Sequence, residues 1–147
     1  PAFRSLSPHD VLTYLALSTE LNGSNNGDLS LPESRARLHG IKSHVTLAQC
    51  LRALRAVGLI AVTRKGGSTK GGQRLATLYR ITDRECYEIR DKTEAMPATN
   101  EWKKIKTVDQ GKQLIAEFEK ANRRLPKLES LRHRVTGTPT ADDVISA

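Results

Sequence analysis

The chain has 147 residues, a length that accommodates one domain with an appendage rather than two full domains. Hydrophobic residues make up 37% and aromatic residues 4% of it, so the core must be mainly aliphatic and a large aromatic-walled cofactor pocket is not expected. No stretch approaches the roughly 20 apolar residues of a membrane helix, and two cysteines are too few for a disulfide framework. The composition therefore predicts a soluble, cytoplasmic protein with no membrane partner.

Positive charge is concentrated in the middle of the chain. The formal net charge is +8, yet residues 34–82 contain ten Lys and Arg side chains and not one Asp or Glu. Ordinary protein surfaces intersperse charges of both signs, whereas a folded segment of one sign attracts polyanions. We therefore expect a polyanionic partner, and a basic face that serves only solubility is the alternative interpretation.

The first half of the chain predicts three helices. The first begins after Ser7, which can cap it, has Pro8 in its first turn, and ends at the Asn- and Gly-rich run 22–27. Its expected apolar stripe is Val11, Leu12, Leu15 and Leu21. A short strand is expected around Leu29 and Leu31.

Ser30 and Glu33 have the spacing of a capping box, which predicts a second, short helix that ends at Gly40. A third helix is expected to follow and to end near Val57, closed by Gly58. Two strands, 59–64 and 76–82, flank a loop at 65–75 that is rich in glycine and cations, and together they predict a β-hairpin.

The composition changes after residue 82. Residues 83–106 are predicted to be a charged connecting segment, and Thr107 can cap an amphipathic helix that ends at Pro126. Residues 107–135 are thus expected to form a helical extension, and residues 136–147 a disordered tail. The apolar stripe of residues 107–125 needs a partner, which is either the body of the same chain or a second copy in a homodimer.

Residues 47–60 carry the most specific pattern in the chain. They read LAQCLRALRAVGLI, with apolar residues at the start and at positions +3, +4, +7 and +10, before Gly-Leu-Ile. With Ala36 and Gly40 upstream, this pattern resembles winged helix-turn-helix DNA-binding proteins, and the resemblance extends over residues 5–82. One departure is the separation of seven positions between Gly40 and Leu47, which is one more than is usual in the family.

The resemblance implies an α+β, mostly helical fold: a winged helix-turn-helix domain at 1–82, with a two-stranded wing hairpin and the C-terminal helical extension. It also implies double-stranded DNA as the partner, because a helix fits the major groove and its outward N-terminal side chains reach base edges. The base-contacting candidates are Ser43, His44, Val45, Thr46, Gln49 and Arg52. The DNA backbone and wing candidates are Arg35, Arg37, Lys42, Arg64, Lys65, Lys70 and Arg74. Ser43 is equally expected to serve only as the helix N-cap, and His44 only as a solvated residue.

No spacing in the sequence predicts chemistry at a metal or a nucleophile. The four histidines are scattered and Cys50 belongs to the apolar face of its helix, so we expect no metal, no cofactor and no enzymatic activity. Short strings such as residues 98–102 also resemble proteins of bacterial plasmids, phages and integrative elements.

The first interpretation is thus sequence-specific DNA binding in the transcriptional regulation of a bacterial mobile element. The alternatives are an accessory factor at a plasmid replication, partition or transfer origin, and a winged-helix module for protein–protein interaction. Single-stranded targets are disfavoured, because Tyr79 is the one aromatic residue in 34–82 on which a base can stack.

Overall fold

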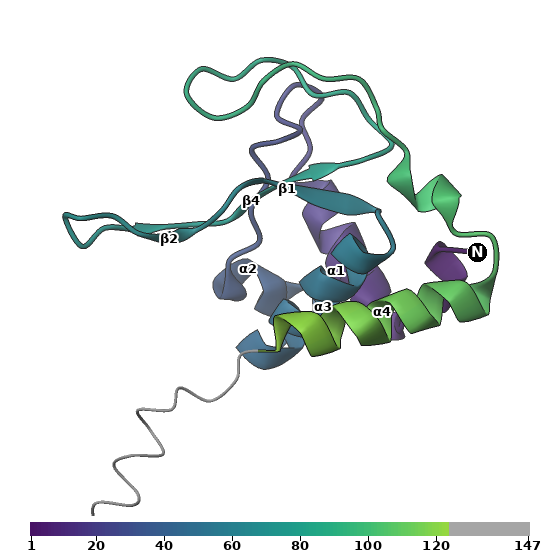
Figure 1. The fold of residues 1–147 in the computed structure, drawn as a ribbon. Helices are drawn as coiled ribbons and strands as arrows, with labels where there is room; N and C mark the ends of the chain where they lie inside the picture. The colour runs from purple at the N-terminus through teal and green to yellow at the C-terminus, as the bar shows by residue number, and fades with distance from the viewer. Residues whose placement is uncertain (124–147) are drawn as a thin grey trace, which may run out of the picture.

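The computed structural model describes residues 1–123, which form an α+β fold of mostly helical content with antiparallel two-stranded sheets, as expected from the sequence. The described elements (Figure 1) are the 3-10 helices η1 (Phe3–Ser5) and η2 (Glu101–Lys104), the helices α1 (Pro8–Thr19), α2 (Glu33–Leu38), α3 (His44–Ala56) and α4 (Val108–Asn122), and the strands β1 (Ile60–Arg64), β2 (Gly67–Ser68), β3 (Arg74–Leu75) and β4 (Leu78–Ile81). The expectations for Pro126, for the extension up to residue 135 and for the tail lie outside the described residues.

Helix α1 begins as the sequence predicts. The Ser7 hydroxyl accepts a hydrogen bond from the Asp10 amide, and the Asp10 carboxylate accepts one from the Ser7 amide at 2.8 Å, so two backbone donors are satisfied at the helix start. Pro8 occupies the first helical position, where a missing N–H costs nothing.

The buried face of α1 differs from the predicted stripe. Leu12 and Leu15 are 41% and 52% exposed, whereas Thr13, Ala16 and Leu17 are fully buried. Thr13 is accommodated because its hydroxyl donates to the carbonyl of His9, so this buried polar atom is hydrogen-bonded. The small side chains let α1 pack closely on α3, and this close packing, not hydrophobicity alone, decides which face is buried.

The predicted capping box of the second helix is wrong. Helix α2 has Pro32 as its N-cap and no side-chain cap, because the chain before it is extended and Leu29 pairs with Tyr79 of β4 through two backbone hydrogen bonds. The short strand expected here is thus reduced to a single antiparallel bridge. At the other end Gly40 takes a φ of +88° as predicted, and the Ile41 amide donates back to the carbonyl of Ala36.

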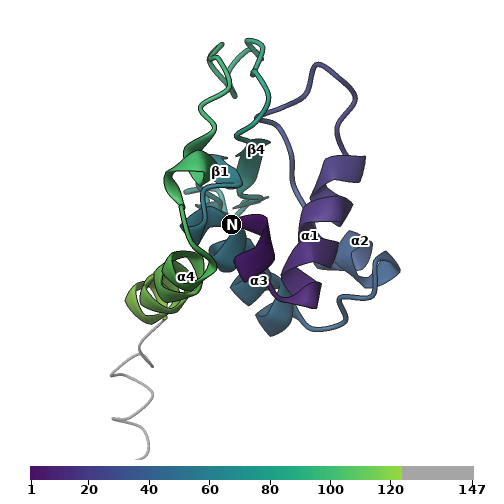
Figure 2. The ribbon, with the colours of Figure 1, turned by 90° about the vertical axis from the view of Figure 1, so that its right-hand side faces the viewer.

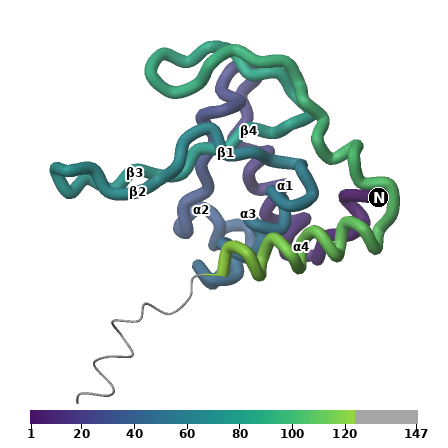
Figure 3. Tube along the Cα trace, in the orientation of Figure 1, coloured from purple at the N-terminus to yellow at the C-terminus, as the bar shows by residue number. Residues whose placement is uncertain are grey.

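The hairpin is longer than its two predicted strands. Strands β1 and β4 pair in register Ile60 with Ile81 and Val62 with Tyr79, and a bulge follows Val62. Beyond it, β2 and β3 form a second short ladder within the stretch expected to be a loop. Residues 65–77, called here the glycine hairpin, consequently extend well away from the body of the protein (Figure 3).

The segment 83–106 is folded onto the body and leads the chain to α4. Two consecutive amides, of Thr99 and Asn100, donate to the carbonyl of Thr82, and Ile105 is buried in the core. Thr107 caps α4 as predicted, accepting from the Gln110 amide at 3.1 Å. Helix α4 then packs against α3 and η1, and these contacts fix its position on the body of the protein.

Candidate nucleic-acid interface

The N-terminal end of α3 is open to solvent. Ser43 is the N-cap, and its hydroxyl accepts a hydrogen bond from the Thr46 amide. The capping role that the sequence predicts for Ser43 is thus confirmed. His44 and Gln49 are exposed, and Val45 is 52% exposed, on the side of α3 away from the core. Five of the predicted base-contacting side chains, Ser43 to Thr46 and Gln49, therefore lie on one accessible helix end.

The glycine hairpin carries the accessible cations of the acid-free region. Lys65, Lys70 and Arg74 are exposed and form no ion pair with any described residue, and the same holds for Lys42 before α3. Arg64 differs, because its guanidinium lies along the hairpin with Nη2 at 3.5 Å from the carbonyl oxygen of Ala76. Its buried Nε has no hydrogen-bond partner among the residues that the structure describes. The hairpin thus presents three exposed cations on a backbone with little side-chain bulk.

Carboxylates from outside the acid-free region neutralise part of its charge. Of the ten cations in residues 34–82, four form ion pairs in the described part of the chain. These pairs are Arg35 with Glu20, Arg37 with Glu33, Arg52 with Glu119, and Arg80 with Glu101. Part of the positive charge of residues 34–82 is therefore neutralised within the protein, and the predicted backbone contacts Arg35 and Arg37 are among the paired cations.

Arg52 is covered by α4. Its Nε and Nη2 donate to the two carboxylate oxygens of Glu119 at 2.6 and 2.8 Å, a side-on bidentate pair. The hydrogen bond raises the pKa of Arg52 and lowers that of Glu119. One turn further along α3, the Arg55 guanidinium lies 5.1 Å from the centre of the Phe118 ring.

These contacts place α4 on the side of α3 that faces away from α1, and Figure 2 shows α3 lying between α1 and α4. The apolar stripe of α4, with Leu114 and Ile115, packs onto the core of the same chain, which was one of the two partners expected for it. The homodimer through residues 107–125 stays an untested prediction. Nothing near Arg52 in the sequence signals this arrangement, because Glu119 is 67 positions away.

Two of the cavities at the surface of the described residues contain residues that bear on the candidate site or could hold a ligand. One of about 290 Å³ runs beside α3, between the start of α1 and α4, and Thr46 and Gln49 line it together with His9 and Glu119. Cys50 also lines it, but burial raises the pKa of its thiol to about 11, so it is no reactive thiolate at neutral pH. Two predicted base-contacting residues, Thr46 and Gln49, thus line the same cavity as Glu119, whose carboxylate binds Arg52.

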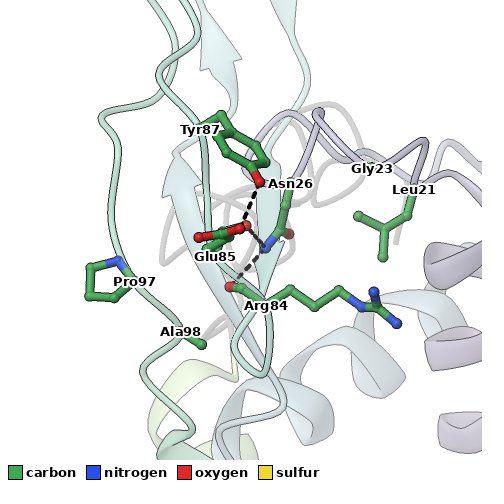
Figure 4. Close-up of a pocket in the computed structure, with 8 residues that line it drawn as sticks. All are labelled: Leu21, Gly23, Asn26, Arg84, Glu85, Tyr87, Pro97 and Ala98. Atoms are coloured by element: carbon green, nitrogen blue, oxygen red, sulfur yellow. Dashed lines mark hydrogen bonds between the residues drawn. The ribbon is translucent and has the colours of Figure 1, made fainter.

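The second cavity, of about 410 Å³, lies between the 22–27 loop and the segment after β4 (Figure 4). Several of its polar groups are paired with one another: the Tyr87 hydroxyl donates to Glu85, and the Asn26 amide donates to the carbonyls of Arg84 and Glu85. Within residues 1–123 no three His, Cys, Asp or Glu side chains gather as a metal site would require. None of the helices in that range has the length and hydrophobicity needed to span a bilayer.

Comparison with known proteins adds no family to this description. The chain matches no protein-family model, no curated protein and no solved structure. A function is therefore to be inferred from the placement and chemistry of the residues themselves. The two features that invite such an inference are the open end of α3 and the cationic hairpin.

Proposed function

We propose that this chain is a winged helix-turn-helix protein that binds double-stranded DNA, with the N-terminal end of α3 in the major groove and the glycine hairpin as its wing. The observation that carries the proposal is the set of exposed hairpin cations that form no ion pair within residues 1–123. The hairpin projects from the side of the molecule where α2 and the start of α3 lie (Figure 1). Lysine and arginine on a slender hairpin can follow a phosphate backbone closely.

The position of α4 sets how α3 can enter the groove. The major groove is about 12 Å wide, and a helix with its side chains is about 10–12 Å across. Two packed helices have axes about 8–10 Å apart, so α3 and α4 together are too wide to enter side by side. The proposal therefore has α3 enter by its N-terminal end, with residues 44–49 toward the bases.

The resemblance of residues 5–82 to winged helix-turn-helix proteins extends the proposal to the control of transcription. A protein bound to an operator in this way competes with other proteins for the same duplex. The chemistry that selects the operator then resides in the exposed side chains at the start of α3, chiefly His44 and Gln49. Gln49 has the amide that pairs with adenine, and Val45 can contact a thymine methyl group.

The test compares two triple variants that remove the same charge from opposite ends of the molecule. One replaces Lys65, Lys70 and Arg74 of the hairpin by alanine. The control replaces Lys104, Lys106 and Lys112, which are exposed and unpaired within the described residues and belong to η2, the start of α4 and the turn between them. Affinity for a labelled mixed-sequence duplex is measured by fluorescence anisotropy over a range of salt concentrations.

Each phosphate contact contributes about 0.9 to the slope of log K against log salt. We therefore expect the hairpin variant to lower the magnitude of the slope by about 2.7 and the control to leave it nearly unchanged. Equal losses in the two variants would refute the proposed interface. Gln49→Ala should instead change which duplexes are enriched from a random pool, with the salt slope preserved.

A further inference from the structure

The C-terminal half of α4 contacts α3 through an ion pair and a cation–π contact. At the start of the helix Gly111 is buried against Ser5, and Leu114 and Ile115 pack on the core. After Ile115, the side chains toward α3 are Phe118, over Arg55, and Glu119, paired with Arg52. The remaining residues of this half are exposed, namely Ala116, Glu117, Lys120, Ala121 and Asn122.

This half of α4 lies over the part of α3 that follows its first turns. A duplex bound at the start of α3 would contact that part next. Arg52 lies one turn beyond Gln49, on the same outward side of the helix. Its guanidinium is engaged through Nε and Nη2, the two-donor edge with which arginine also binds a phosphate. The Glu119 carboxylate thus stands where an anionic group of the nucleic acid would bind.

We propose that the ion pair of Arg52 with Glu119 is an autoinhibitory contact: the end of α4 covers α3 at Arg52, next to its exposed N-terminal end, and duplex DNA competes with Glu119 for Arg52. This inference rests on the proposed function. In the covered state only the first turns of α3 contact DNA; once Glu119 is displaced, Arg52 joins the interface. The partly exposed pair is weak enough for a polyanion to displace it, because such pairs shift an equilibrium by only about 1.5- to 5-fold.

The test uses the full chain and two single variants on the same helix. Glu119→Gln removes the charge that holds Arg52 and keeps the shape of the side chain. Glu117→Gln removes an equal charge from the exposed side of α4, where Glu117 contacts Gln113 and touches no cation among the described residues. Both variants raise the net charge by one, so any gain in general attraction to DNA is the same.

We expect Glu119→Gln to bind a labelled mixed-sequence duplex about 1.5- to 5-fold more tightly than Glu117→Gln does. In an Arg52→Ala background this difference should vanish, because the competing guanidinium is gone. Equal affinities of the two variants in the native background would overturn the autoinhibitory role and leave DNA binding intact. If the native chain and both variants, shown to be folded by circular dichroism, bind no duplex, the proposed function itself fails.

Discussion

Replacing Gly111 by alanine should destabilise the protein, although alanine is the better helix former. Gly111 lies within α4, where the exchange alone would favour folding by about 0.8–1.0 kcal/mol. In the structure, however, a Cβ at this position would lie 2.7 Å from the Cβ of Ser5 and 3.5 Å from Cγ2 of Ile105. The Cβ of Ser5 is fixed to the backbone of η1, so the overlap cannot be relieved by a rotamer change.

The magnitude follows from the two opposing terms. Overpacking a tight contact costs about 1–3 kcal/mol, and the upper half of that range applies because the hydroxyl of Ser5 overlaps as well as its Cβ. Subtracting the gain in helix propensity leaves a net loss of about 1–2 kcal/mol. For a chain of this size the loss corresponds to a fall in Tm of roughly 3–8 °C.

Urea denaturation followed by circular dichroism measures this loss. The control is the same exchange in a Ser5→Gly background, where the overlapping side chain is absent and alanine should stabilise the protein. The sign of the effect thus depends on Ser5, and a double-mutant cycle isolates that dependence. If Gly111→Ala raises the stability in the native background, α4 does not pack on η1 as described. Its contact with α3 would then be in doubt as well.

Two further predictions concern polar contacts. Because Arg52 lowers the pKa of Glu119 below its usual 4.5, the pair stabilises the folded state fully above that value and loses its effect as pH falls through the lowered pKa. The native chain should therefore exceed Glu119→Gln in stability by about 0.2–1 kcal/mol near neutral pH, and a gap that persists in strong acid would contradict the pair. Asn26→Ala should cost about 2–4 kcal/mol, since its buried side chain pairs with both backbone groups of Ile81. The exposed control Asn22→Ala should change stability by less than about 0.5 kcal/mol, and equal losses in thermal melts would count against the role of Asn26.

Local signals in the sequence predicted several of the helix ends correctly. Ser7 and Thr107 cap their helices, and Gly40 and Gly58 close theirs with positive φ angles. Such termini depend on hydrogen bonds between groups a few residues apart, so the local sequence is nearly sufficient to predict them. The pairing of the two strands into a hairpin is local in the same sense, although the second ladder of β2 and β3 was not foreseen.

Contacts between distant segments decided what the sequence pattern misjudged. Leu12 and Leu15 look like core residues on a helical wheel, yet the close approach of α1 to α3 buries Thr13 and Ala16 instead. Gly111 looks like a weakness in its helix, yet it gives Ser5 room. The capping box at Ser30 fails because Leu29 is drawn into a bridge with Tyr79.

For the candidate site, the sequence by itself determined the composition of the interface: an acid-free stretch of ten cations, a glycine-rich hairpin and a helix with polar residues at its start. The tertiary structure alone decided which of those cations are available. Glu20, Glu33, Glu101 and Glu119 take up four of them. Three of these carboxylates belong to segments that are separated from their partners by loops. The sequence does not show that they are close, because an ion pair depends on the distance between the charges in space and not along the chain.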